Sequence, residues 1–159
     1  MPKRSPGTRP KSRSPRPGPA RPGTPLAPPP QVPGQAAPCP CCSGRAYGAC
    51  CGPLHAGDAR AATAEALMRS RFCAFAVGDA GYLLSSWHSS TRPARLALDP
   101  SIRWTRLEIL DSADGGAFHS EGTVEFRAYF RERGGAEESM QENSSFVRED
   151  GAWVYLSAL

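Results

Sequence analysis

The sequence contains no apolar run approaching the roughly 20 residues needed to cross a bilayer, so we expect no membrane-spanning segment. It also lacks the apolar core of roughly 7–15 residues that marks a secretory signal, and we therefore expect a cytoplasmic protein. Residues 39–159 contain no lysine, and their 12 arginines are outnumbered by 15 acidic residues. This mildly acidic balance excludes a domain that binds nucleic acid through an overall basic surface.

Several catalytic signatures are absent as well. The sequence contains no nucleophile elbow, no glycine-rich phosphate loop and no H-E-x-x-H zinc motif. The sequence therefore carries none of the usual motifs of α/β-hydrolases, P-loop nucleotide-binding proteins or zinc proteases.

The N-terminal region is rich in proline and basic residues. Residues 1–38 hold 13 of the 17 prolines and seven Lys or Arg, with no acidic residue, and their only aliphatic side chains beyond alanine and Met1 are Leu26 and Val32. Such a segment buries too little apolar surface to offset its ordering entropy, so we predict a disordered tail over 1–38. Its charges permit only weak binding to nucleic acid, and an inert extension is the alternative.

Five of the six cysteines fall within 13 residues, in the segment CPCCSGRAYGACC. Two close-set thiol pairs joined by a short turn suit a tetrahedral Zn²⁺ site. The predicted ligands are Cys39, Cys41, Cys50 and Cys51. A site closed by four thiolates is structural, because no position is left for substrate. Redox-active thiols and disulfides are the alternatives, which a reducing compartment disfavours.

The remaining candidate ligands have other expected roles. Cys42 is an extra thiol at the edge of the cluster, and His55 is a substitute ligand or a solvated loop histidine. Cys73 falls in a helical apolar pattern and is expected to be an inert core residue. Loss of the zinc ion is expected to unfold the knuckle and to spare the larger domain.

The cysteine segment resembles the SEC-C zinc motif, whose usual form is CPCGSGKxYKxCC, and departs from it at Cys42, where the motif has glycine. This motif is known from the zinc tip of the preprotein-translocase motor, which contacts a chaperone and the ribosome. The resemblance implies a zinc knuckle over residues 39–57 that docks a protein partner such as a chaperone, a translocase or the ribosome.

Downstream of the knuckle, the pattern predicts two helices followed by four strands. Thr63 is a candidate N-cap, Gly78 a helix stop, and Asp79 the cap of a second short helix, with one further helical turn expected over 94–98. Period-two alternation predicts strands over 102–111, 122–133, 139–147 and 152–157. We therefore predict an α+β domain with helices packed on a curved antiparallel sheet. The charged outer face of the sheet meets either solvent or a second copy of the chain in a homodimer.

This order of elements is similar to that of the YchJ-type family of bacterial proteins. The matching phrases include CCGPLHAG, TAEALMRSRF, WHSSTRP, GTVEFRAYF and SFVREDGAWVY. The resemblance implies that a SEC-C knuckle precedes a cone-shaped domain of the nuclear transport factor 2-like fold, here at 58–159. The family tends to read His-Glu-x-Ser-Arg-Phe where this chain has Gln141 to Phe146, which weakens the case for a family-wide acid–base site.

Two functions from different classes remain open for the cone. The favoured one is a binding module, which holds a ligand in the cone and docks a partner through the knuckle. The alternative is a small enzyme with an active site in the cone interior around His88 and Glu142. The candidate pocket residues are His88, Trp104, Arg127 and Glu142.

Each candidate also has a structural interpretation. His88 is expected to cap a helix or lie at the surface, and Trp104 is expected in the core. Glu142 is expected to be buried and paired with an arginine, for which Arg69, Arg71, Arg92 and Arg127 are candidates. Arg69 and Arg71 are otherwise expected on a solvated helix face.

Overall fold

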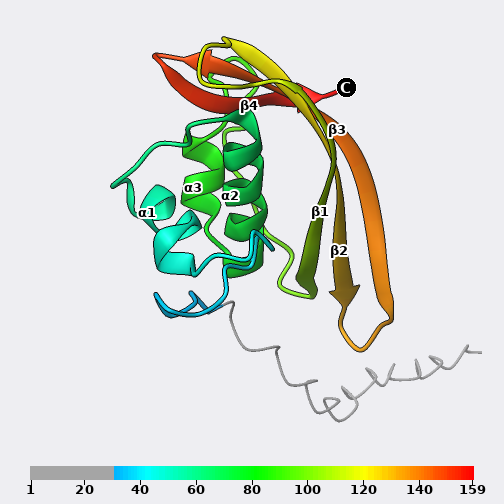
Figure 1. The fold of residues 1–159 in the computed structure, drawn as a ribbon. Coiled ribbons are helices and arrows are strands. Elements are labelled where there is room, and N and C mark those ends of the chain that lie inside the picture. Colours follow the sequence, from blue (N-terminus) through cyan, green and yellow to red (C-terminus); the bar gives the residue numbers. More distant parts are fainter. Residues whose placement is uncertain (1–30) are drawn as a thin grey trace, which may run out of the picture.

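The computed structural model describes residues 31–159 (Figure 1). Most of the expected tail, residues 1–30, lies outside the described residues. The elements, in chain order, are η1 (Tyr47–Ala49), α1 (Cys51–Ala56), α2 (Ala64–Val77), α3 (Ala80–Ser85), β1 (Ile102–Asp114), β2 (Glu121–Glu132), β3 (Glu137–Glu149) and β4 (Ala152–Ala158). Within 31–159, no helix has both the length and the apolar character to cross a membrane.

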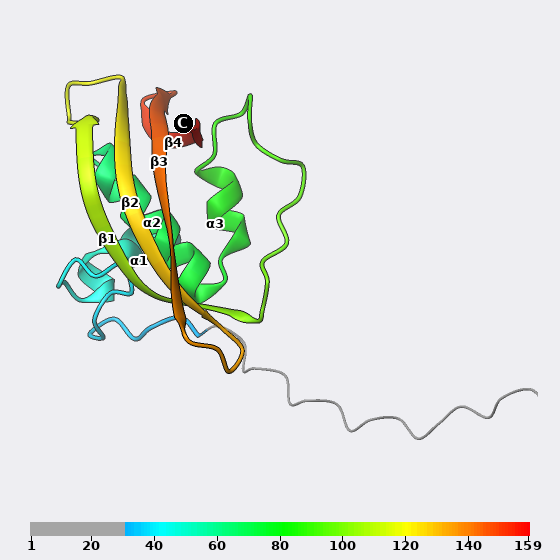
Figure 2. The ribbon, with the colours of Figure 1, turned by 90° about the vertical axis from the view of Figure 1, so that its right-hand side faces the viewer.

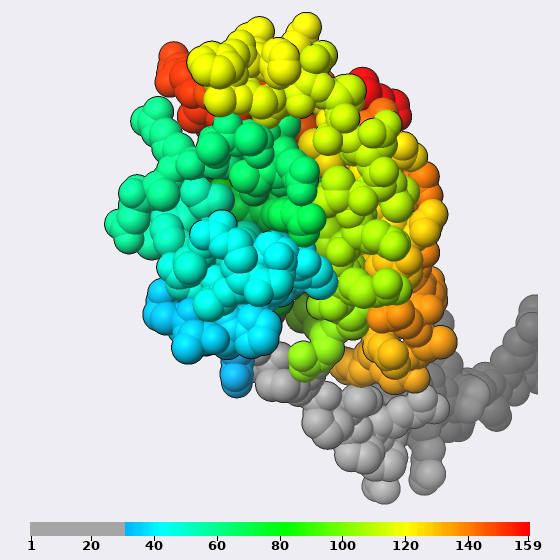
Figure 3. Space-filling view, viewed as in Figure 1, coloured from blue at the N-terminus to red at the C-terminus, as the bar shows by residue number. Residues whose placement is uncertain are grey.

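The elements form three layers with α2 in the middle. The sheet curves around one side of α2, while α1 and the segment before it cover the other side (Figures 1 and 2). Helix α2 contacts α1, α3, β1, β2 and β4. The space-filling view shows the cysteine-rich segment, in blue and cyan, packed directly against the green helices (Figure 3). Because α2 is covered on both sides, residues all around it are buried.

Both helix starts have side-chain caps at the predicted residues. Thr63 Oγ1 accepts a hydrogen bond from the Ala66 amide at 3.0 Å, and Asp79 Oδ1 accepts one from the Tyr82 amide at 2.9 Å. Gly78 ends α2 with a φ of 78°, a left-handed conformation that costs glycine little. The two caps and the helix stop are thus confirmed.

The four strands form an antiparallel meander in the order β1-β2-β3-β4, which confirms the predicted α+β class. The strands run up to three residues beyond the predicted bounds. The prediction of a helical turn at 94–98 is wrong, since this segment has no helical hydrogen bonding and belongs to the long connection between α3 and β1. The main core lies between α2 and the concave face of the sheet, and includes Phe72, Val124, Phe126, Phe146 and Trp153.

The knuckle receives backbone contacts from residues 34–38, which were expected to belong to the tail. The Tyr47 amide donates to the carbonyl of Ala37 at 2.8 Å, and the Gly48 amide donates to that of Gln35 at 2.9 Å. Pro38 forms an isolated antiparallel bridge with Ala46. The backbone contacts of the knuckle therefore extend to Gly34, Gln35 and Ala37, ahead of the expected start at residue 39.

Removing residues 31–38 is expected to weaken the knuckle. A chain that starts at Cys39 leaves the amide of the buried Tyr47 without its acceptor, which costs about 1–3 kcal/mol relative to a chain that starts at Gln31. Denaturant unfolding of the two shortened chains measures the difference. Equal free energies of unfolding would contradict a stabilising role for these contacts.

Candidate functional site

Four cysteine sulfurs meet inside the knuckle, between the CPCC turn and the start of α1. The Sγ atoms of Cys39, Cys41, Cys50 and Cys51 all lie within 4.8 Å of one another. Two of the separations are 3.6 Å, between Cys41 and Cys50, and 3.9 Å, between Cys50 and Cys51. Tetrahedral Zn²⁺ with Zn–S bonds of about 2.3 Å requires sulfurs about 3.8 Å apart. The four thiols therefore fit a tetrahedral metal ion.

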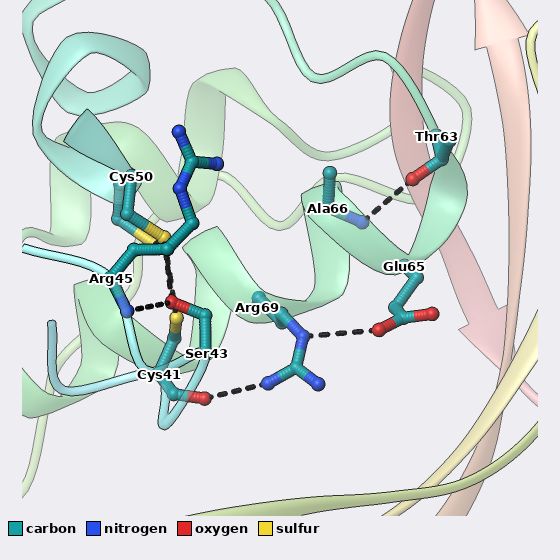
Figure 4. Close-up of polar contacts among 9 residues, drawn as sticks. Cys41, Ser43, Arg45, Cys50, Thr63, Glu65, Ala66 and Arg69 are labelled. Atoms are coloured by element: carbon teal, nitrogen blue, oxygen red, sulfur yellow. Dashed lines mark hydrogen bonds and ion pairs between the residues drawn. The ribbon is translucent and has the colours of Figure 1, made fainter.

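Local backbone geometry aims these thiols at one point. The Cys39 amide donates to the Arg45 carbonyl at 2.9 Å, which folds the CPCC turn back on itself. Cys50 lies between η1 and α1, where it caps both helices. The side chains of Cys50 and Cys51 therefore project from a sharp bend of the chain. The Ser43 hydroxyl lies 3.2 Å from Cys50 Sγ, where it can donate to a thiolate (Figure 4). Such a donor disperses charge from a metal-bound sulfur.

The thiols cannot all ionise without a cation. Hydrogen bonding from Cys51 lowers the pKa of Cys41 to about 4, whereas burial raises the pKa of Cys39 to about 12. The contact with Cys41 also raises the pKa of Cys51. One thiolate thus suppresses the ionisation of its neighbours. A bound divalent cation would compensate the negative charge of four thiolates.

The knuckle is anchored to α2 by side chains from both partners. Arg69 Nη1 donates to the Cys41 carbonyl at 2.9 Å while its Nε donates to Glu65 Oε1 at 3.1 Å (Figure 4). Cys73 and Val77 of α2 lie in one apolar cluster with three of the four cysteines. Cys73 is fully buried, as expected for a core residue. The four-cysteine cluster is therefore built against α2 and is not an isolated appendage.

His55 is a second anchor and not a ligand. Its Nε2 lies 2.9 Å from the Ser70 carbonyl and its Nδ1 lies 2.9 Å from the Tyr47 hydroxyl. Because a carbonyl only accepts, Nε2 carries the proton and Nδ1 accepts from the tyrosine. Both ring nitrogens are thus committed, and His55 joins η1, α1 and α2.

Cys42 lies at the exposed edge of the turn, outside the group of four. It has a φ of 63°, in the left-handed region, which accounts for the glycine at this position of the motif. Its side chain is exposed.

Replacing Cys42 with glycine is expected to preserve the four-thiol site and to raise the free energy of unfolding by about 0.5–1 kcal/mol, because the left-handed strain is relieved. Metal content and denaturant unfolding, each compared with Cys42→Ala, check both parts. Loss of metal from Cys42→Gly would show that Cys42 is a ligand.

A second feature is a cavity of about 240 Å³ between α2, the connection after α3 and the concave face of the sheet. Most of its wall is apolar. Its aromatic lining consists of Phe72, Phe75, Trp87, Trp104, Phe126 and Tyr155. Its polar lining consists of Arg71, Glu142 and Ser144. An apolar hollow with a few polar groups is the usual form of a small-molecule site.

Arg71 is the most unusual of these polar groups. It is 4% exposed, and the two hydrogen bonds that the structure gives it run from Nη1, to the Leu83 carbonyl at 2.8 Å and to Ser86 Oγ at 2.7 Å. Its guanidinium lies over the rings of Tyr155, at 4.7 Å, and Trp87, at 5.1 Å. Burial lowers the pKa of Arg71 to about 10. The expectation that Arg71 lies on a solvated face is wrong, because α2 is covered on both sides.

Glu142 is half-buried and faces the cavity from β3. It accepts a hydrogen bond from Ser144 Oγ at 2.7 Å. Among residues 31–159 it forms no ion pair with arginine, so the expected pairing is wrong. Ser144, on the same face of β3, satisfies the carboxylate where an arginine was expected.

The structure brings together two of the four candidate pocket residues. Trp104 lines the cavity with Glu142. His88 lies outside it, with Nε2 3.6 Å from Glu149 Oε2 and Nδ1 2.7 Å from Ser90 Oγ. Arg127 is on the opposite face of β2 from the cavity-lining Phe126 and donates to Gln141 Oε1 at 2.9 Å. The expected pairing of His88 with Glu142 in one acid–base site is therefore not assembled.

Sequence reasoning missed Arg71 and Trp87 as cavity residues. Trp87 lines the cavity, and its buried Nε1–H has no hydrogen-bond partner among the described residues. The available signal was the helical spacing of Arg71 from Met68 and Phe75, which places all three on one side of α2. All three line the cavity.

Known proteins share this arrangement. Residues 63–158 match the family model described as YchJ, middle NTF2-like domain. A UPF0225 protein of Streptomyces coelicolor is 64% identical over 118 residues, covering 74% of this chain and 91% of the relative. A UPF0225 protein of Corynebacterium efficiens is 51% identical over 117 residues, covering 74% and 88%.

Two solved structures also resemble this fold. The solution structure of a SEC-C motif containing protein from Rhodopseudomonas palustris has a TM-score of 0.67 and 37% identity, covering 77% of this chain and 98% of that one. The crystal structure of a SEC-C motif containing protein from Psychrobacter arcticus has a TM-score of 0.63 and 26% identity, covering 77% and 82%. The chain therefore belongs to the YchJ (UPF0225) family, with a SEC-C cysteine cluster and an NTF2-like domain.

Proposed function

We propose that this protein is a small-molecule-binding module in which a structural zinc knuckle braces the cone-shaped domain. The cavity carries this proposal, because it combines an apolar aromatic wall with a few polar groups at the centre of the fold. Its volume of about 240 Å³ is below the roughly 300–1,000 Å³ of sites for drug-sized ligands. The occupant is therefore a molecule of about one ring with a short substituent.

The metal of the knuckle is zinc in this proposal. Four thiolates are a soft, tetrahedral donor set, which zinc occupies in closed structural sites. The supporting geometry is the mutual approach of the four sulfurs within 4.8 Å. The ion holds the knuckle on α2, and α2 in turn forms one wall of the cavity.

The outer surface of the knuckle is the docking site for a protein partner, by analogy with the SEC-C motif of the translocase motor. Arg45 is exposed beside the cysteine turn, and a shallow cleft runs from it towards Arg60 and Arg69. A chaperone, a translocase or the ribosome is the class of partner that the motif implies.

Nuclear magnetic resonance tests the binding function. The probes are small aromatic compounds, namely phenol, benzyl alcohol and 3-phenylpropionate, titrated while the indole N–H signals of Trp87 and Trp104 are followed. We expect at least one probe to bind saturably. Ala128, which is 2% exposed and lines the cavity, is replaced with leucine to fill it, and this variant should lose the response. The matched control Ala56→Leu, exposed at the end of α1, should retain it.

The proposal fails if no probe shifts the cavity signals, or if folded Ala128→Leu protein binds as tightly as the unaltered chain. The thermal midpoint of Ala128→Leu shows whether that variant is folded, since overpacking alone costs about 1–3 kcal/mol.

A further inference from the structure

The cavity contains a buried cation without a counter-ion in contact. No carboxylate among residues 31–159 forms an ion pair with Arg71, although this side chain is only 4% exposed. Burying an unpaired charge is costly, and a buried charge in a cavity is a candidate functional group. Glu142 stabilises the charge of Arg71 from the same cavity, but at a distance and without an ion pair. The aromatic rings of Tyr155 and Trp87 give Arg71 partial compensation by cation–π contact.

The guanidinium also has donors to spare. Its two hydrogen bonds to protein atoms both leave from Nη1 and hold the end of α3. The Nε and Nη2 groups have no acceptor among the described residues. A guanidinium presents its donors as a planar fork that matches the two oxygens of a carboxylate. Trp87 belongs to the same cavity wall, but its Nε1–H is sealed from the cavity, so the free donors of the site are those of the guanidinium.

The rest of the cavity restricts the ligand to a monoanion. Glu142 lines the same cavity and adds a negative charge. The two charges of a dianion such as a phosphate monoester would face one cation, Arg71, and both would be repelled by Glu142. A single carboxylate needs only the one cation. The aromatic lining and the volume of about 240 Å³ fit one ring or a branched alkyl group attached to it.

Resting on the proposed binding function, we propose that the cavity selects small aromatic or branched aliphatic carboxylates, with the carboxylate held by Arg71 and the apolar body packed against Trp104 and Phe126. Glu142 then limits the affinity, because its charge repels the carboxylate of the ligand across the cavity.

Three probes of one shape test the selectivity, namely 3-phenylpropionate, its neutral amide 3-phenylpropionamide and the cation 3-phenylpropylamine. Dissociation constants are measured from the indole N–H signals of Trp87 and Trp104. We expect the carboxylate to bind about tenfold or more tightly than the amide, and the amine to bind most weakly. Equal or tighter binding of the amide or the amine would overturn the carboxylate assignment while leaving a small-molecule site in place. The absence of a response to all three would overturn the binding function as well.

Glu142→Gln tests the same assignment without altering the guanidinium. Removing the competing charge should tighten 3-phenylpropionate binding by about three- to tenfold and leave the amide unchanged. The matched control is Glu138→Gln, an exposed position on the same strand with the same change of net charge. An unchanged or weaker affinity of Glu142→Gln for 3-phenylpropionate, or an equal gain in Glu138→Gln, would contradict the assignment.

Discussion

Cys51→Ser is expected to abolish metal binding and to destabilise the whole described fold by about 3–5 kcal/mol. Cys51 is 1% exposed, belongs to the four-thiol group and packs in the same cluster as Cys73. A hydroxyl at this position is a poor ligand for a thiolate-bound metal, and it would leave a buried polar group without a suitable partner. Elemental analysis should give one zinc ion per chain before the substitution and none after it.

Cys42→Ser is the matched control. It makes the same chemical change in the residue next to Cys41, but at an exposed side chain outside the group of four. It should retain the metal and the thermal midpoint. Retention of one zinc ion by Cys51→Ser, or its loss from Cys42→Ser, would defeat the assignment of the ligands.

From the structure, we expect metal loss to destabilise the larger domain as well as the knuckle. The sequence had predicted that metal loss spares the larger domain. In the structure, Arg69 donates to the Cys41 carbonyl and His55 to the Ser70 carbonyl, so the knuckle and α2 share hydrogen bonds. Unfolding the knuckle also exposes Cys73 and Val77, which are buried against it. We therefore expect a chelator to lower the thermal midpoint of the whole domain. An unchanged midpoint after complete removal of the metal would restore the earlier expectation.

The sequence predicts those features whose causes are local. The cap at Thr63 depends on a side chain three residues from the amide it satisfies, and the strand faces follow from alternation within single strands. The metal ligands were likewise predicted from spacing, and the four sulfurs do converge. In each case, the chemistry acts within a short stretch of chain.

Features that depend on distant packing were not predicted. Arg71 looks like a solvated residue until α2 is known to be covered by the knuckle on one side and the sheet on the other. Glu142 accepts a hydrogen bond from Ser144 on its own strand and forms no ion pair with an arginine among the described residues. His88 and Glu142 share no element, and the path of the connection after α3 decides that His88 pairs with Glu149.

Arg71→Met is expected to eliminate carboxylate binding while leaving the free energy of unfolding unchanged or higher. Burial lowers the pKa of Arg71 to about 10, which corresponds to a cost of roughly 3 kcal/mol for keeping this charge in the folded state. Methionine retains an unbranched apolar side chain for the space beside Trp87 and Tyr155. The Ser86 hydroxyl lies 2.7 Å from the Tyr82 carbonyl and 3.3 Å from the Leu83 carbonyl, so after the substitution its single proton is shared between these two acceptors, and the loss of the Arg71 donor offsets part of the gain.

Arg69→Met, two residues earlier on the same helix, should behave in the opposite way. It loses the hydrogen bond to the Cys41 carbonyl, so the free energy of unfolding should fall by about 1–2 kcal/mol, while the cavity keeps its cation and its affinity for 3-phenylpropionate. Denaturant unfolding and titration of both variants separate the two roles. If folded Arg71→Met protein still prefers 3-phenylpropionate to 3-phenylpropionamide by the same factor as the unaltered chain, the guanidinium has a structural role only. A loss of more than about 3 kcal/mol of stability would show instead that its bonds to α3 outweigh the cost of its burial.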